Sequence, residues 1–280
     1  MGETDPAAGE AAGAGSSCAT RYPILLVHGA GFRDDYALFG YWGRIPKALR
    51  AEGAAVYYGR QDAWGSVRDN ALALRDRALA CLRESGSGKL NIIAHSKGGL
   101  EARYMISSLG MGDRVESLTT ISTPHRGSKT IDLVCALAGP ALGLAAIFVN
   151  LHYRLLGDRR SDFAAAVREL STRACGEFNR ANPDHPGVLY QSYAGKMRNA
   201  LSDPLFAFSH PIVKLVEGDN DGLVATSSAA WGADRGLIES RRWRGVSHAD
   251  LVDAWRMNLA GFDIREVYLR IARELKEGGH

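Results

Sequence analysis

The residues most clearly able to carry out catalytic chemistry lie in the segment 90–99, LNIIAHSKGG, where an apolar run meets a serine flanked by small residues. A strand, a sharp turn and then a helix would leave the hydroxyl of Ser96 exposed at the turn, which is the geometry of a nucleophile elbow. Small neighbours are needed because the backbone folds tightly there, and a large side chain at Ala94 or Gly98 would collide across the turn. We therefore predict that Ser96 is a nucleophile.

A serine hydroxyl is a weak nucleophile at neutral pH, so it needs a histidine base that a carboxylate orients. After an elbow of this kind the acid comes next in the chain and the histidine last. The acidic, turn-rich loop EGDNDGLV at 217–224 offers Asp219 and Asp221, and the loop GVSHAD at 245–250 offers His248. The remaining candidate histidines lie in less suitable contexts: His125, His152, His185 and His210.

The segment 21–32, RYPILLVHGAGF, reads as a buried strand that runs into a His-Gly turn. Backbone N–H groups at such a turn, together with the N–H after the serine, can hold a developing oxyanion. We therefore expect Ala30 and Lys97 to donate through their main chains, with the Lys97 side chain incidental. His28 is expected to be architectural, and His95 to point into the sheet.

These motifs resemble those of the bacterial true lipases, which have the α/β-hydrolase fold. The resemblance spans roughly residues 22–260, and it rests on four separated motifs that agree in order: VHG at 27–29, AHSKGG at 94–99, ISTPHRGS at 121–128 and NDGLV at 220–224. It implies Asp221 rather than Asp219 as the acid. Two positions depart from the family pattern, because Lys97 stands where many such lipases have glutamine and Ala30 is smaller than the usual apolar residue.

The resemblance also implies a structural calcium ion near the histidine loop. Asp250 matches one ligand position and Asp203 is a second candidate, but Ala254 stands near the place of the usual glutamine. Calcium prefers several oxygen ligands, and Asp250 can instead be a favourable acid at a helix N-terminus. The metal site is thus left undecided, and the chemistry itself needs no cofactor.

Residues 133–149, LVCALAGPALGLAAIFV, form an uncharged stretch with three interpretations. A membrane-spanning helix needs about 20 apolar residues, and this run is short and interrupted by Gly139 and Pro140. A buried helical hairpin is the second interpretation. We favour the third, an apolar cap or lid over the active site that opens at a lipid surface.

Alternating apolar and amphipathic segments predict an α/β fold, with a mostly parallel sheet covered by helices on both faces. Strands are expected at 23–28, 54–58, 90–95, 115–122, 188–194 and 211–217. Helices are expected at 42–52, 64–84, 97–109, 162–181, 248–257 and 263–276. The expected organisation is a disordered tail over 1–20, a hydrolase core over 21–130 and 211–276, and a cap insertion over 131–210.

The net charge of +3 comes from scattered basic residues, the densest group being Arg241, Arg242 and Arg244, so we expect no nucleic-acid partner. The four cysteines have no metal-binding spacing. Cys81 is expected to be a buried thiol, whereas a bridge between Cys135 and Cys175 stays open. The tail lacks the apolar run of a secretory signal, while the resemblance implies an extracellular protein; the localisation is left undecided.

Together these features predict a serine ester hydrolase that cleaves esters of apolar acyl chains at an oil–water interface, with triacylglycerols as the expected substrates. A short-chain esterase or thioesterase of the same fold is the nearest alternative. A non-catalytic binding protein is another, because fold does not guarantee function. No transmembrane anchor is expected, and acyl-chain length and oligomeric state lie beyond the sequence.

Overall fold

A computed structural model describes residues 16–34, 40–240, 243–258 and 261–280 of the chain. In these residues six strands form one sheet in the order β2-β1-β3-β4-β5-β6, and every neighbouring pair is parallel. The strands are β1 (Ile24–Val27), β2 (Val56–Tyr58), β3 (Leu90–His95), β4 (Val115–Ile121), β5 (Leu189–Gly195) and β6 (Ala233–Ile238). The predicted α/β fold with a parallel sheet is confirmed.

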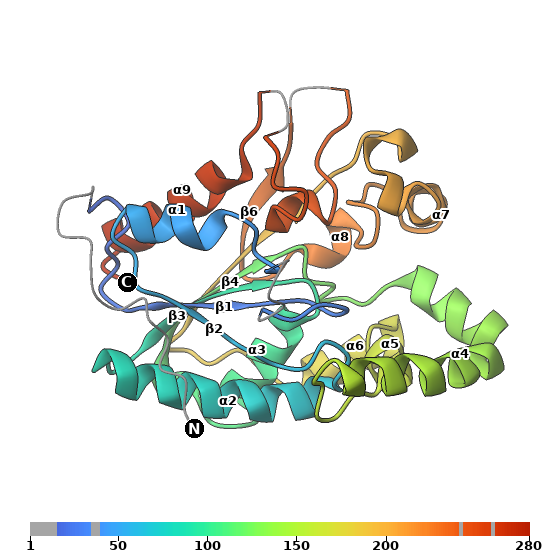
Figure 1. Cartoon of the computed structure of the whole chain (residues 1–280), viewed down its shortest axis with the longest axis horizontal. Helices are drawn as coiled ribbons and strands as arrows, with labels where there is room; N and C mark the ends of the chain where they lie inside the picture. The colour runs from blue at the N-terminus through green and yellow to red at the C-terminus, as the bar shows by residue number, and fades with distance from the viewer. Residues whose placement is uncertain (1–15, 35–39, 241–242, 259–260) are drawn as a thin grey trace.

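Helices cover both faces of this sheet (Figure 1). They are α1 (Ile45–Ala51), α2 (Val67–Ser85), α3 (Gly98–Ser107), α4 (Lys129–Leu155), α5 (Phe163–Arg168), α6 (Thr172–Ala181), α7 (Ser209–Glu217), α8 (Thr226–Ala229) and α9 (Ile264–Glu277). Side chains alternate across a strand, so Ile24 and Leu26 of β1 pack toward α1 and α9, while Leu25 and Val27 pack toward α2 and α3. Burial on both faces explains why β1, with the sequence ILLV, is a continuous apolar run.

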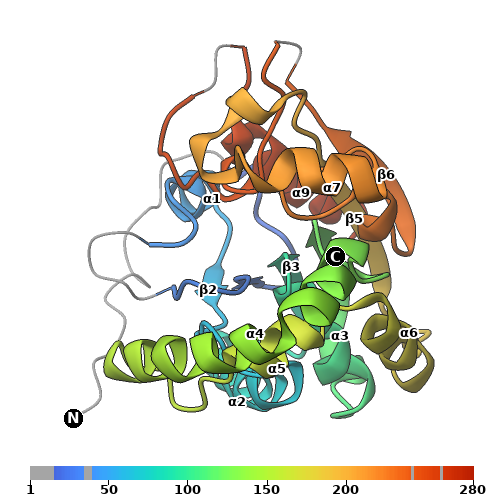
Figure 2. The same cartoon turned by 90° about the vertical axis from the view of Figure 1, so that its right-hand side faces the viewer.

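Because the strands are parallel, their carboxyl ends meet at one edge, at the right of Figure 1. Helices α4 and α7 both lie at that edge, α4 below the sheet and α7 above it. Figure 2 looks at the molecule from this side and shows both helices in front of the sheet. The loops that follow β1 and β3 reach the same edge, so the predicted nucleophile and oxyanion turn lie at the edge where the two helices also lie.

The uncharged stretch belongs to α4, whose 27 residues form two helical segments, and the Ser128 hydroxyl caps the first by accepting the N–H of Ile131. The two segments meet in a kink at Ala138, whose φ and ψ of −121° and 19° are not helical, and Pro140 follows just after it. Only Leu142 and Ala146 are buried along its whole length. The buried-hairpin interpretation is therefore wrong. Length and composition alone would let α4 cross a membrane, and the helix packs against α5, α6 and α7.

Three element predictions are wrong. The segment 211–217 is not a strand but part of α7, and 248–257 holds only one 3₁₀ turn, Asp250–Val252. The expected helix at 162–181 is divided into α5 and α6. Strand β6 was not predicted from the sequence, because its segment ADRGLI is mostly exposed and lacks an apolar period.

The predicted domain boundaries also need correction. Strand β5 pairs with β4 and β6 inside the sheet, so the range 131–210 is not a single cap insertion. Residues 1–15 of the expected tail lie outside the described residues. Residues 16–20 do not form a tail, because Cys18 is buried in the core and its thiol donates to the carbonyl of Leu269.

The four cysteines are all free thiols. Cys81 is buried as predicted, and burial raises its pKa to about 11. Cys175 is buried too, and its Sγ donates to the carbonyl of Pro124 rather than bonding to Cys135.

Candidate active site

Ser96 stands at the junction of β3 and α3 with a φ of +55°, in the left-handed region that side chains rarely adopt. Its N–H donates to the carbonyl of Ile121, which fixes the turn against β4. The close approach explains the small neighbour: a Cβ at Gly98 would lie 2.3 Å from the carbonyl oxygen of His28. The Ser96 side chain is partly exposed while its neighbours in β3 and α3 are buried, as the elbow prediction requires.

The second group of predicted residues meets behind the serine. His248 Nδ1 and Asp221 Oδ2 are 2.7 Å apart, and the His248 N–H also donates to the Asp221 carbonyl oxygen. The other carboxylate oxygen of Asp221 accepts the N–H groups of Leu223 and Val224. Asp221 is fully buried, so its charge is balanced by these three donors rather than by water.

The His248 ring lies 4.3 Å, centroid to centroid, from the ring of His95, the residue before the serine. The structure thus places the His248–Asp221 pair against His95, the residue next to Ser96 in the chain. Neither Ser96 Oγ nor His248 Nε2 has a hydrogen-bond partner among the described residues. The hydrogen bond between a catalytic serine and its histidine is often long or poorly aligned before substrate binds.

Asp219, the alternative acid, has a different role. Its carboxylate is partly exposed and bonds to the ammonium groups of Lys196, at 2.6 Å, and Lys214. These two cations lower its pKa to about 2. It makes no bond to His248, so the geometry favours Asp221, as the family resemblance implies.

The turn after β1 lies directly against the serine. A Cβ at Gly29 would be 2.7 Å from Ser96 Cβ, so only glycine fits this approach. The Gly29 N–H donates to the hydroxyl of Tyr41, whereas the N–H groups of Ala30 and Lys97 have no hydrogen-bond partner in the described part of the chain. These two unpaired amides are the ones predicted to form the oxyanion hole.

Two further histidines help to build the site. His28 is architectural as expected, because its ring nitrogens contact the carbonyls of Gly29, at 2.7 Å, and Gln61, at 3.0 Å. The expectation for His95 is wrong: its ring lies between Tyr41 and His248 instead of inside the sheet. Burial lowers the His95 pKa well below its usual value, so the ring is neutral and its Nδ1 accepts the Tyr41 hydroxyl.

Sequence reasoning missed Tyr41 and misjudged Lys97. The hydroxyl of Tyr41 connects the oxyanion turn to His95, but Tyr41 belongs to no motif that would have marked it. The Lys97 side chain is not incidental, because it is buried and forms an ion pair with Glu101 at 2.5 Å. The spacing of four residues in a helix was the available signal.

The other candidate histidines lie elsewhere. His125 is buried against Trp231 and contacts the Thr120 hydroxyl, and burial lowers its pKa well below 6.5. His152 is exposed on α4 and His185 contacts Asp113, while His210 is buried in α7. None of them forms a hydrogen bond or ion pair with Asp221 or Asp219, whose partners are given above.

The two predicted calcium ligands do come close, since Asp203 Oδ2 accepts the Ser247 hydroxyl and Asp250 Oδ2 accepts the Ser247 N–H. However, the guanidinium of Arg244 already contacts Asp250 at 3.1 Å and donates to the Ser202 carbonyl at 2.7 Å. Within the described ranges no three His, Cys, Asp or Glu side chains gather as metal ligands. Arg244 thus places a cation of the protein itself beside Asp250, one of the two predicted ligands.

Comparison with known proteins agrees with this geometry. Triacylglycerol lipase 2 of Saccharomyces cerevisiae is 30% identical over 257 residues, which cover 85% of this chain and 74% of the yeast protein. A triacylglycerol lipase of Vibrio cholerae is 33% identical over 237 residues, which cover 76% of this chain and 75% of that protein. The chain belongs to the triacylglycerol lipase family.

Solved structures agree on the fold of this lipase. The lipase of Staphylococcus hyicus superposes with a TM-score of 0.70 at 16% identity, covering 96% of this chain and 99% of that one. A metagenomic carboxyl esterase superposes with a TM-score of 0.75 at 16% identity, covering 99% and 81%. No family model matches the chain. The lipase is a carboxylic ester hydrolase, which sets aside the non-catalytic alternative.

Proposed function

We propose that this lipase cleaves esters of apolar acyl chains, triacylglycerols among them, through an acyl-enzyme intermediate on Ser96. Ser96 Oγ attacks the ester carbonyl while His248 Nε2 takes its proton. The N–H groups of Ala30 and Lys97 hold the oxyanion, and His248 then gives the proton to the leaving alcohol. Water repeats the cycle on the acyl-enzyme and releases the acid.

The observation that carries this mechanism is the bond between the buried Asp221 carboxylate and His248 Nδ1. An acceptor there keeps the proton on Nδ1 and leaves Nε2 free to act as a base. The two unpaired amides beside a serine with positive φ supply what remains of the chemistry.

Exposed apolar side chains support a lipid substrate. On α4, Leu137 is 83% exposed and Phe148 is 67% exposed, and on α7 Leu215 is 88% exposed. The set also includes Leu133, Leu144, Ile147, Leu151 and Leu155 of α4, Ile212 of α7, and Leu201, Leu205 and Phe208 just before α7. Apolar surface of this extent is typical of contact with a membrane or a partner, and here it flanks the site.

Helix α4 is tied at both ends to the site region. Near its start Glu217 of α7 accepts the hydroxyls of Ser128 and Thr130, and near its end the Tyr153 hydroxyl donates to the carbonyl of Gly31 in the oxyanion turn. We propose that α4 and α7 form the cap and contact the oil–water interface.

A short-chain esterase or thioesterase is the second candidate, favoured by the fold similarity to a carboxyl esterase. The test is a series of p-nitrophenyl esters from acetate to palmitate, alongside emulsified triglyceride, with wild type and Ser96→Ala. A lipase should hydrolyse the emulsion and the long esters, with all activity lost in Ser96→Ala. Turnover confined to soluble short esters would favour the esterase.

We further propose that the Arg244 guanidinium takes the place of a structural calcium ion at the histidine loop, so that this lipase needs no calcium there. The guanidinium joins the Ser202 carbonyl, next to Asp203, to Asp250, two residues after His248. The ion pair is largely buried, which makes the contact less sensitive to screening by salt.

A further inference from the structure

Directly behind the proposed oxyanion hole lies a buried ion pair that the mechanism does not use. Lys97 Nζ contacts Glu101 Oε1 at 2.5 Å and donates to the carbonyl of Gly65 at 2.7 Å. Both side chains are almost completely buried. Glu101 lies in the first turn of α3, where a negative charge interacts favourably with the helix dipole.

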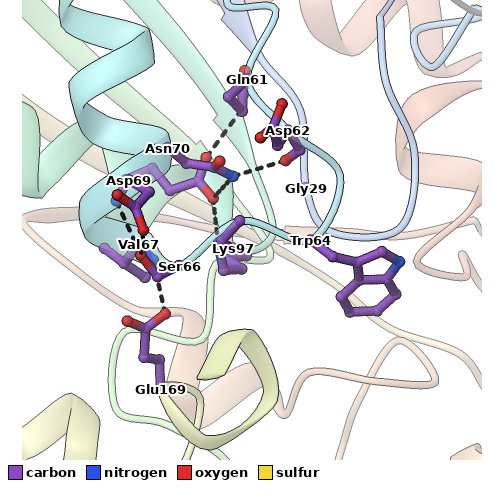
Figure 3. A network of polar contacts seen from close by, with 12 residues as sticks. Gly29, Gln61, Asp62, Trp64, Ser66, Val67, Asp69, Asn70, Lys97 and Glu169 are labelled. Carbon is purple, nitrogen blue, oxygen red and sulfur yellow. Dashed lines mark hydrogen bonds and ion pairs between the residues drawn. The ribbon is translucent and has the colours of Figure 1, made fainter. Parts of the chain in front are cut away.

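Two neutral amides, those of Asn70 and Gln61, complete the hydrogen bonding of Glu101. Figure 3 shows both amides near Lys97. Asn70 Nδ2 donates to Oε1 at 2.8 Å, and Gln61 Nε2 donates to Oε2 at 3.1 Å. Asn70 also donates to the carbonyl of Asp62, so the network holds the loop between β2 and α2 against the elbow.

Gln61 extends the network to the other half of the oxyanion hole. The side-chain Nε2 of Gln61 donates to the carbonyl of His28 at 2.9 Å, and the main-chain carbonyl of Gln61 contacts His28 Nε2 at 3.0 Å. His28 is two residues before Ala30. A continuous chain of contacts therefore runs from Lys97 through Glu101 and Gln61 to the turn that carries Ala30.

A stabilising effect on the fold does not explain why these buried polar groups are present. Burying two charges costs about as much as their attraction returns, so a buried ion pair is weak evidence for a stabilising role. Moreover, Gln61 Oε1 is buried and finds no hydrogen-bond partner among the residues that the structure describes, which is unfavourable for folding. The feature that these contacts share is their position behind the two unpaired amides.

We propose that the Lys97–Glu101 ion pair, with Gln61, is the positioning device of the oxyanion hole: it fixes the backbone N–H of Lys97 and that of Ala30 relative to each other. The proposal rests on the proposed role of those two amides. Removing one oxyanion donor costs about 10²- to 10³-fold in kcat. A donor that is displaced rather than removed should cost less, about 10- to 100-fold.

The test compares Lys97→Met, Glu101→Met and the double variant. Each single variant leaves a buried charge without its partner, so both Tm and kcat should fall. The double variant removes both charges, and we expect it to recover most of the lost Tm while kcat stays about 10- to 100-fold low. KM for a soluble ester should change little. Affinity for an alkyl boronic acid, whose serine adduct places a hydroxyl in the hole, should fall with kcat.

Gln61→Leu gives a second, independent variant, because it removes the side-chain hydrogen bonds to Glu101 and to the His28 carbonyl and leaves no unpaired charge. We expect it to lower kcat and boronic acid affinity with a small change in Tm, and it decides the question if the double variant does not fold. Lys89→Met is the matched control, since Lys89 pairs with Glu116 at 2.7 Å at the start of β3, away from the elbow.

Recovery of kcat and boronic acid affinity together with Tm in the double variant would overturn the positioning role, as would wild-type values for both in Gln61→Leu. Ser96→Ala, assayed in parallel, separates this result from a failure of the proposed function. Turnover in Ser96→Ala contradicts the mechanism itself. An inactive Ser96→Ala beside fully active network variants contradicts only the positioning device.

Discussion

Replacing Asp221 by asparagine should inactivate the lipase through the tautomer of His248. One carboxylate oxygen accepts two backbone N–H groups, from Leu223 at 3.1 Å and Val224 at 2.8 Å, and the other faces His248 Nδ1 at 2.7 Å. The amide oxygen of an asparagine must stay with the two N–H donors, so its NH₂ group faces the imidazole. Nδ1 then becomes an acceptor, and the proton moves to Nε2, the atom that must accept a proton from Ser96.

The wrong tautomer in a serine triad costs about 10⁴-fold in kcat, and each factor of ten is about 1.4 kcal/mol. The expected loss of transition-state stabilisation in Asp221→Asn is therefore about 5 kcal/mol. The fold should survive, because asparagine has nearly the same shape and keeps the two bonds to Leu223 and Val224.

Asp219→Asn is the matched control, two residues away in the same loop. Its carboxylate is partly exposed and pairs with Lys196 and Lys214, an arrangement worth about 0–1 kcal/mol of stability and without contact to His248. Initial rates on a soluble p-nitrophenyl ester, with circular dichroism to verify the fold, measure both variants. A larger loss in Asp219→Asn, or near-native activity in Asp221→Asn, would refute the assignment.

Three further predictions follow from the described contacts. Phe148→Asp, at an exposed position of α4, should impair hydrolysis of emulsified triglyceride more than hydrolysis of a soluble ester, with Tm unchanged. As the control, Leu142→Asp at the buried face should lower Tm and both activities. Equal losses on both substrates in Phe148→Asp would contradict the cap assignment. Burial holds His95 and His125 neutral in the folded protein, so as the pH falls the unfolded chain binds protons at these rings first. The free energy of unfolding should therefore fall as the pH drops below about 6.5, by up to about 1.4 kcal/mol per pH unit for each ring. Urea titrations between pH 5 and 8 measure this free energy, and a flat profile would speak against the prediction. Tm of the wild type should be unaffected by EDTA, while Arg244→Gln should lower Tm and kcat; a wild type that loses Tm in EDTA and regains it with calcium contradicts the role of Arg244.

The parts of the site that carry local backbone signals could be predicted from the sequence. A β-branched run before AHSKGG and a turn-rich NDGLV mark the elbow and the acid loop, because small residues and turn formers are needed there for steric reasons. The choice between Asp219 and Asp221 depended on a family resemblance, since either carboxylate fits the chain order.

The wrong predictions of secondary structure have a physical cause, which is contact between residues far apart in the sequence. The apolar run at 211–216 has strand propensity, but Ile212 and Leu215 are exposed, and the helix α7 buries His210 and Val213 instead. The expected helix at 248–257 stops because Asp253 adopts a φ of +57°, with its carboxylate held by Arg44 from α1's N-terminus. Such tertiary contacts override local propensity.

The central claim is that Ser96 attacks the ester, and labelling with a fluorophosphonate tests it most directly. Intact mass spectrometry should show one adduct per chain, and peptide mapping should place it on Ser96, with activity lost in proportion to labelling. Ser96→Ala should take up no label and lose several orders of magnitude in turnover, on the order of 10⁶-fold as in other triad knockouts. An adduct on another residue, or a folded Ser96→Ala that still hydrolyses esters at a near-native rate, would contradict the account.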